Sequence, residues 1–421
     1  MKLYFLLIFL FLNKSYGNSI ENSWIFSGTT HFWLKGETTT LNNSPLTAND
    51  SPLALPKYSK GFLIQEDFSA KNASLEWIFR PSIGSYQEAY NLYPENTDLL
   101  KKKIDGRINE LYFINTKNSI WTYALGLQNF QWGPAELMSP SNPLFHFSAH
   151  TQDPSFQIQG HSLFRLNHTP DENWNFILLY EFAANEEESF IYKTPFVPKG
   201  LLKIEYRFPS STDYIGISTG NEQMHDPFIG EYGNFNLDDE FSFYFDLKQS
   251  HISKRYYPYI DYGQPPRMNL FEYDGSVYLL SLLGLRFETD YFDFRWEEIS
   301  NELGYSKSEM EQVSLSFQSG SPLSNDNMKA FLHNGRELVS KSYSYLSLRS
   351  KNLISWLDST ISIRGLYAHR DQSSLATLQW DGSVGDRVRF FMNIQTNFGK
   401  SNSEMTFLYK NKANIGIDLI W

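Results

Sequence analysis

The sequence predicts an all-β protein: a single antiparallel transmembrane β-barrel of about 18 strands (16–18) with long extracellular loops. Three observations predict it. Polar and apolar residues alternate along segments of about nine to thirteen residues, the length with which a tilted strand crosses the hydrocarbon layer. Aromatic residues make up 17% of a chain whose mean hydropathy is only −0.41. Short turns alternate with long polar connections along the chain.

The first residues have the pattern of an export signal. Lys2 precedes an unbroken apolar run, Leu3 to Leu12, and Ser15 and Gly17 supply the small residues of a cleavage site. The run is too short for a transmembrane helix. Residues 1–17 are therefore predicted to be a secretory signal peptide and residues 18–421 the barrel, placed in the outer membrane of a Gram-negative bacterium.

Composition restricts the function classes. The chain has no cysteine, so it has no disulfide framework and no thiol chemistry. Once Lys2 and Lys14 leave with the signal peptide, 34 basic and 47 acidic side chains give a net charge of −13, which argues against a nucleic-acid partner. The many aromatic rings suit a barrel with an apolar outer face and a polar lumen. No metal-ligand cluster or cofactor motif is present, so neither a metal nor a cofactor is predicted.

The alternation indicates which side chains face the lumen. In the segment Leu201 to Phe208, charged residues share one face of the strand and apolar residues share the other, since successive side chains point to opposite faces. The segment Arg387 to Phe398 repeats this pattern. The predicted lumen-lining residues are Glu205, Arg207, Arg295, Arg364, Arg387 and Arg389. Two interpretations stay open: a mixed-charge channel that selects solutes, or an ion-pair network that plugs the lumen.

The connections predict the topology. Tight turns are expected near residues 70–72, 117–118, 237–239, 288–290 and 351–352, and long connections at about 35–59, 81–105, 129–155, 184–200, 250–273 and 299–337. If the first strand, Trp24 to Leu34, runs outward, all these long connections are extracellular and the strand count is even. Glu311 to Ser319 could be a further strand or a hairpin in a loop, and the even count places it in the loop.

The last eight residues form an amphipathic strand that ends on an aromatic residue. Ile415, Ile417, Leu419 and Trp421 share one face. This end resembles the closing strand of bacterial outer-membrane barrels, which the outer-membrane insertion machinery reads. The resemblance implies that this machinery and outer-membrane lipid are partners, and that Trp421 lies at the periplasmic rim.

The segment Trp132 to Pro143 is the most distinctive stretch for function. Trp132-Gly133-Pro134 predicts a turn where a strand leaves the membrane, and Asn142 before Pro143 favours a second turn. Trp132, Gly133 and Pro134, followed by Ser141 and Asn142, resemble the signature loop of the Wzi-type capsule assembly proteins. Those are 18-stranded barrels that act as surface lectins for capsular polysaccharide. The family usually doubles the Trp and the Asn, whereas here Gln131 precedes Trp132 and Pro143 follows Asn142.

A second group of barrels is similar over the same stretch. Its Gly-Arg-Gln, Trp-Gly and Asn-Pro pattern corresponds here to Gly126, Gln128, Trp132, Gly133, Asn142 and Pro143. Members of this group are mostly uncharacterised or porin-like, and this stretch is similar to both groups of barrels.

Tyrosines in a long connection bear on the lectin interpretation. Tyr256, Tyr257 and Tyr259 lie near Lys254 and Arg255, and sugars stack on rings beside polar groups. They are candidate glycan contacts, with the alternative that these rings pack loops together. The leading expectation is a non-enzymatic protein for capsular or extracellular polysaccharide assembly or attachment; the alternative is a porin-like diffusion channel for small polar solutes. An outer-membrane hydrolase is the weakest hypothesis, because adjacent His161 and Ser162 on a strand point to opposite faces and no catalytic residues stand out.

Overall fold

The computed structural model describes most of the chain from Trp24 onward. The described residues are 24–41, 56–92, 97–145, 159–183, 198–209, 211–221, 227–251, 254–259, 267–272, 276–318, 327, 338–351, 358–400, 403–406 and 409–421. The predicted signal peptide, residues 1–17, lies outside them. No helix among the described residues is long and apolar enough to cross a membrane.

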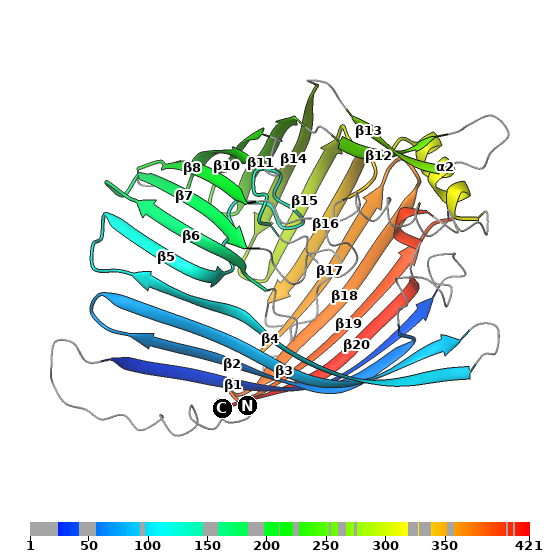
Figure 1. Ribbon diagram of the computed structural model, residues 1–421, viewed down its shortest axis with the longest axis horizontal. Helices are drawn as coiled ribbons and strands as arrows, with labels where there is room; N and C mark the ends of the chain where they lie inside the picture. The colour runs from blue at the N-terminus through cyan, green and yellow to red at the C-terminus, as the bar shows by residue number, and fades with distance from the viewer. Residues whose placement is uncertain are drawn as a thin grey trace.

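Eighteen strands form one antiparallel sheet (Figure 1), which confirms the predicted fold class and strand number. They are β1 (Ile25–Leu41), β2 (Tyr58–Lys71), β3 (Leu75–Leu92), β4 (Thr97–Asn115), β5 (Trp121–Gln128), β6 (His161–His168), β7 (Trp174–Ala183), β8 (Lys199–Arg207), β9 (Tyr214–Asn221), β10 (Pro227–Asn236), β11 (Phe241–His251), β14 (Val277–Glu288), β15 (Phe292–Asn301), β16 (Ser342–Lys351), β17 (Asp358–Ala368), β18 (Ser373–Val384), β19 (Val388–Phe398) and β20 (Tyr409–Ile420).

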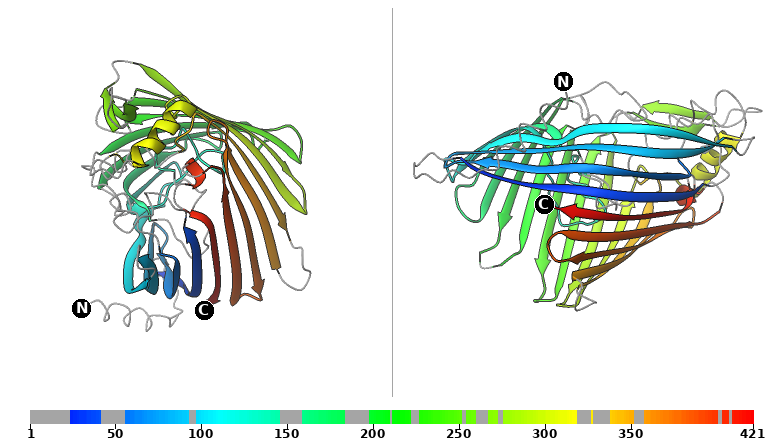
Figure 2. Two further views of the ribbon diagram at one scale, coloured as in Figure 1. Left: turned by 90° about the vertical axis from the view of Figure 1, so that its right-hand side faces the viewer. Right: turned by 90° about the horizontal axis from the view of Figure 1, so that it is seen from below.

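The sheet closes on itself through its first and last strands. Each strand pairs with the next along the chain, and β20 pairs with β1 from His31 opposite Ile420 to Leu41 opposite Tyr409. Figure 2 shows β1 and β20 side by side. Closure leaves no unpaired edge, which a strand-based membrane protein requires because lipid offers backbone groups no hydrogen bonds.

Smaller elements sit on one end of the barrel. The hairpin of β12 (Lys254–Tyr259) and β13 (Arg267–Glu272) lies between β11 and β14, and helix α2 (Lys307–Gln318) lies between β15 and β16. The short helix η3 (Glu404–Thr406) lies between β19 and β20. We call this end the loop end, and the opposite end, with the short turns and Trp421, the turn end.

The two faces of the wall differ as the sequence predicts. Outward side chains are apolar and exposed, such as Ile363 at 53% and Leu283 at 51%. Aromatic rings of neighbouring strands pack together near the turn end. The ring centroids of Trp174 and Tyr206 are 4.8 Å apart, and those of Phe241 and Phe287 are 4.4 Å apart. Such a girdle marks the edge of the apolar band in membrane barrels.

Turn residues explain the short connections. The Asn72 side chain accepts hydrogen bonds from the amides of Ser74 and Leu75, and the Asp238 carboxylate accepts from those of Glu240 and Phe241. These Asx turns reverse the chain within a few residues. The predicted tight turns near residues 71 and 238 are confirmed.

Two sequence expectations were wrong. The predicted long connection at 81–105 is mostly strand, since β3 runs to Leu92 and β4 starts at Thr97. Three consecutive lysines, Lys101 to Lys103, hide the alternation there. The second error concerns Glu311, which lies in α2. The backbone N–H of Ser306 donates to the Glu309 carboxylate at 2.6 Å, a capping box that the sequence Ser-Lys-Ser-Glu could have revealed.

Inward tyrosines pack over glycines of neighbouring strands. A Cβ added to Gly284 would lie 2.1 Å from the Tyr244 ring, and one added to Gly216 would lie 2.2 Å from the Tyr232 ring. We expect Gly284→Leu to lower the free energy of unfolding by about 1–3 kcal/mol, the usual range for overpacking. Urea unfolding of the folded barrel in detergent micelles measures this. Gly365→Leu is the control, because a Cβ there meets nothing within 4 Å; equal destabilisation by both variants would contradict the packing argument.

Candidate channel constriction

Residues 129–145 of the β5–β6 connection fold into the barrel and are bonded to its inner wall. The amides of Glu136 and Leu137 donate to the Glu297 carboxylate on β15 at 2.7 and 3.2 Å. The Ser141 amide donates to Asp246 on β11 at 2.6 Å. We call residues 129–145 the lumen loop.

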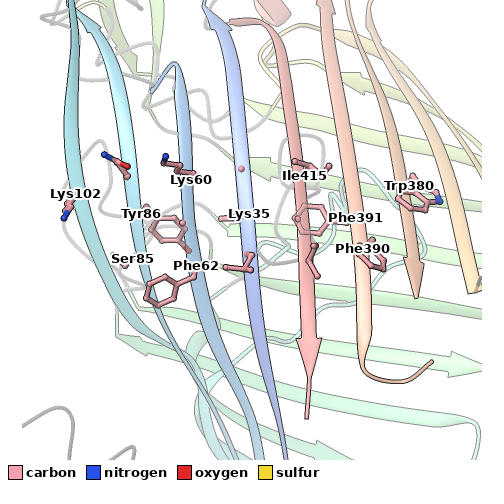
Figure 3. Close-up of a pocket in the computed structure, with 16 residues that line it drawn as sticks. Lys35, Lys60, Phe62, Ser85, Tyr86, Lys102, Trp380, Phe390, Phe391 and Ile415 are labelled. Atoms are coloured by element: carbon pink, nitrogen blue, oxygen red, sulfur yellow. The ribbon is translucent and has the colours of Figure 1, made fainter. Parts of the chain in front are cut away.

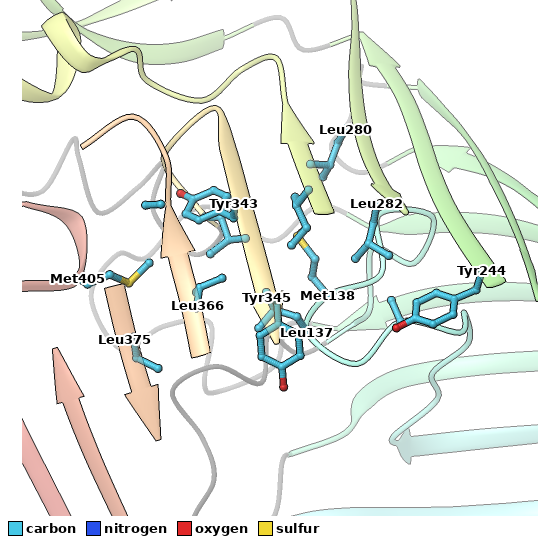
Figure 4. Close-up of a cluster of buried hydrophobic side chains, with 14 residues drawn as sticks. Leu137, Met138, Tyr244, Leu280, Leu282, Tyr343, Tyr345, Leu366, Leu375 and Met405 are labelled. Atoms are coloured by element: carbon cyan, nitrogen blue, oxygen red, sulfur yellow. The ribbon is translucent and has the colours of Figure 1, made fainter. Parts of the chain in front are cut away.

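Apolar contacts attach the lumen loop at two places on the inner wall. Leu137 and Met138 pack among residues of β11 and β14–β18 (Figure 4), with Leu137 fully buried between side chains such as Tyr345 and Leu282. Trp132 and Leu144 pack on the wall of β6–β10, against residues that include Leu163, Ile177, Leu179, Leu201, Phe228 and Tyr232. The lumen loop therefore joins two separate sectors of the wall and narrows the lumen between them.

Local sequence explains this path. Gly133 has φ +98°, and a Cβ there would lie 2.3 Å from the Ser139 hydroxyl and 2.8 Å from the Asp246 carboxylate, so only glycine fits. The Asn142 side chain accepts from the Leu144 amide at 3.0 Å and donates to the Trp132 carbonyl at 3.3 Å. The predicted turns at Gly133 and Asn142 are present, but they serve a segment inside the barrel.

Glu136 carries the lumen loop's charge into an arginine cluster. Its carboxylate lies 3.3 Å from Arg364, 3.4 Å from Arg295 and 3.9 Å from Arg349. The Tyr345 hydroxyl donates to it at 3.1 Å. This carboxylate thus offsets the positive charge of three strands, and it stands where the lumen loop meets the wall.

Other lumen charges are also paired, either along one strand or between neighbouring strands. Glu205 on β8 accepts from Lys203 at 2.7 Å, from Arg207 at 3.1 Å and from the Tyr232 hydroxyl at 3.0 Å. Asp293 on β15 pairs with Arg286 and Arg295. Such pairs stiffen the wall and leave a mixed-charge inner surface.

The structure places the residues predicted to line the lumen as follows. Strand parity puts Glu205, Arg207, Arg295, Arg364 and Arg389 on the inward face, which is the face that carries the lumen loop's partners. Arg387 differs, since it is exposed in the turn between β18 and β19, just outside the strand. The alternation from Arg387 onward had extended the strand by one residue.

Most of the residues predicted to contact glycan lie away from an open surface, and Tyr259 is the exposed exception. Trp132, Ser141 and Asn142 are at most 7% exposed, and Gly133 and Pro134 are half-buried beside them. In the β12–β13 hairpin, the Tyr257 hydroxyl donates to the Leu303 carbonyl at 3.0 Å and the Tyr256 carbonyl accepts from Tyr305, while Tyr259 is exposed. Tyr256 and Tyr257 thus help to pack the hairpin onto the β15–β16 connection.

Sequence reasoning missed Glu136, Asp246 and Arg349. Asp246 alternates with apolar residues on β11 and could have been recognised as inward, as could Arg349 on β16. Glu136 had no such signal, because a loop has no period that assigns its side chains to a face.

A half-buried carboxyl at the loop end couples this region to pH. Glu404 lies in η3, outside the membrane-spanning strands; burial raises its pKa to about 7, and nearby Asp371 raises it too, while hydrogen bonds from the Tyr343 hydroxyl oppose the rise. The folded state therefore holds a proton that the unfolded state releases between its ordinary pKa of 4.5 and about 7. Stability of this end is greatest below that window and falls as pH rises through it.

We therefore expect the loop end to open more readily at about pH 8 than at about pH 5, by up to about 3 kcal/mol. Hydrogen exchange of the Val339 and Met405 amides, corrected for the intrinsic rate, measures this opening. Glu404→Gln should abolish the pH dependence. A pH dependence that persists in this variant would assign the effect to another group.

The fold and the lumen loop together define a closed 18-stranded barrel with a loop folded into its lumen. No family model matches the sequence, and no curated protein matches it. The structure is similar to OccAB1 of Acinetobacter baumannii, with a TM-score of 0.54 and 8% identity over 94% of this chain and 96% of that one. It is also similar to OccK1 (OpdK) of Pseudomonas aeruginosa, with a TM-score of 0.54 and 9% identity over 94% and 98%.

These similarities correct the sequence interpretation. At such identities they establish the 18-stranded porin fold. The resemblance to the Wzi-type capsule assembly proteins is wrong, because the similar structures are Occ proteins. The assignment of Trp132 to Asn142 to a lectin loop loses its basis, and the alternative of a porin-like channel is favoured over capsule assembly.

Proposed function

We propose that this protein is a non-enzymatic diffusion channel for small polar solutes in the outer membrane of a Gram-negative bacterium, with the lumen loop as its constriction. The turn end faces the periplasm, since it carries the short turns and Trp421, and the loop end faces outward. The main observation behind this proposal is the lumen loop. It crosses the lumen and places Glu136 among Arg295, Arg349 and Arg364.

The charges at the constriction support a selective rather than a general channel. Positive and negative groups face each other there, with Arg295 between Glu136 and Asp293. A solute that carries both a hydrogen-bonding and an anionic group can exchange contacts with such pairs as it passes. Similar structures support the same class of solute, because one of them is OpdK with vanillate, an aromatic carboxylate.

Planar-bilayer recording of the purified full chain tests the proposal. We expect discrete single-channel steps, and liposomes containing the protein should swell faster in a small carboxylate such as vanillate than in a neutral disaccharide. The matched control is protein heat-denatured before reconstitution. A correctly folded barrel that inserts but remains electrically silent would contradict the proposal and favour a plugged barrel.

A further inference from the structure

A groove of about 730 Å³ crosses the outer wall at the seam where β20 meets β1. Its lining comes from β18–β20 and β1–β4 (Figure 3). Most of the lining side chains point away from the lumen, and they include Leu34, Phe62, Trp380, Phe390, Ile415, Ile417, Lys60 and Lys102. This groove therefore faces the lipid rather than the channel.

Strand register arranges the groove in rows. One outward row runs Trp380, Met392, Ile415, Gly36, Lys60, Gln87, Lys102 across seven strands. The next row toward the turn end runs Gly382, Phe390, Ile417, Leu34, Phe62, Ser85, Ile104. Two cations thus stand directly beside a strip of exposed apolar side chains, and Figure 3 shows Lys60 and Lys102 on the loop-end side of Phe62 and Ser85.

Within the described part of the chain, no acidic side chain offsets the positive charges of the two lysines. None of its ion pairs includes Lys60 or Lys102. No described residue in their row, or in the row on either side, is acidic. Cations that face the lumen nearby do have partners: Lys412 pairs with Glu37 at 3.1 Å, and Lys101 lies over the Tyr90 ring at 4.9 Å.

The height of the row matches the outer boundary of the membrane. Phe26 belongs to the aromatic girdle of the turn end, and its ring centroid lies 6.1 Å from that of Phe68. From Phe26 to Gly36 the strand rises about 33 Å, which at the usual tilt of roughly 40° is about 25 Å of height. That equals the height of the apolar band, so Lys60 and Lys102 reach the level where lipid phosphates lie.

We propose that this groove binds one lipid of the outer leaflet that carries a phosphate headgroup. Lys60 and Lys102 contact the phosphate, and an acyl chain lies across Phe62, Leu34 and Ile417. The inference rests on the proposed function only in that both require a barrel that spans the outer membrane; it does not require a conducting lumen. Gly36 leaves room for the chain, since a Cβ there meets nothing within 4 Å.

Native mass spectrometry of the full chain, released from nanodiscs of phosphatidylcholine and lipid A, tests the proposal. We expect one lipid A to stay bound to the wild type. Lys60→Gln combined with Lys102→Gln should weaken its binding about thirtyfold, the combined effect of two basic side chains at an anionic membrane surface. The matched control is Lys101→Gln with Lys103→Gln, the same charge change on the lumen face of β4.

A second pair of variants separates the groove from its charges. Gly36→Trp fills the groove and should also release lipid A, whereas Gly365→Trp, on the outer wall of β17 with equal free space, should not. Equal retention by the Lys60/Lys102 double variant and the wild type would overturn the proposal. Displacement of lipid A by inorganic phosphate alone would also overturn the proposal. The same holds if a second copy of the chain is found to cover the groove. Bilayer conductance of the same variants reports separately on the channel.

Discussion

Removal of the lumen loop should widen the channel. Replacing residues 134–143 with a short glycine-serine linker deletes Glu136 and the apolar contacts of Leu137 and Met138, but keeps Trp132 and Leu144 on the β6–β10 wall. We expect single-channel conductance to rise roughly two- to threefold, because the narrowest cross-section of a pore limits its conductance. Discrimination between vanillate and a neutral disaccharide should fall in the liposome-swelling assay.

A point substitution distinguishes release of the lumen loop from its loss. Asp246 is fully buried and accepts hydrogen bonds from the Ser139 hydroxyl and the Ser141 amide. Asp246→Ala should leave the lumen loop present but less firmly attached, so that conductance fluctuates between the wild-type level and that of the deletion. Asp238→Ala, in the β10–β11 turn, is the control. Unchanged conductance in the deletion variant would show that the constriction lies elsewhere in the barrel.

The barrel wall was predictable because successive residues of a strand point to opposite faces, so polar and apolar residues alternate in the sequence. Glu205, Arg207, Arg295, Arg364 and Arg389 could each be assigned to the inner face from parity alone. Strand number followed from the alternation of turns and connections. The period failed where both faces are polar, as at Lys101 to Lys103, and the lipid-facing Lys102 was therefore assigned to a loop.

The constriction was not predictable in the same way. Glu136 meets Glu297 across 161 positions of sequence, and its partners Arg295, Arg349 and Arg364 come from three different strands. Gly133 and Asn142 correctly indicated turns, but a turn can lead a chain outward or inward. What decides the direction is the apolar inner wall around Leu163, Ile177 and Leu179, which is recognisable only once the barrel is closed.

The charge of Glu136 should set the ion selectivity of the channel. Glu136→Gln removes one negative charge within 4 Å of Arg295, Arg349 and Arg364 while its amide can still donate to Glu297. The lumen loop should therefore stay in place while Arg349 and Arg364 lose the Glu136 charge and Arg295 keeps only Asp293 as an acidic partner among the described residues. A charged cleft with low-dielectric walls concentrates its counter-ion, so we expect the chloride-to-potassium permeability ratio to rise by about tenfold. The reversal potential in a potassium chloride gradient measures this ratio.

The opposite substitution and a surface control make the selectivity test specific. Arg364→Gln should shift the reversal potential toward potassium, because Glu136 then has fewer cations to offset. Glu172→Gln, exposed in the β6–β7 turn, carries the same charge change as Glu136→Gln and should leave the potential unchanged. The Glu136 effect should shrink in molar salt, where screening shortens the range of the arginine charges to about 3 Å. A shift of equal size in Glu172→Gln would mean that net charge, rather than the constriction, controls selectivity.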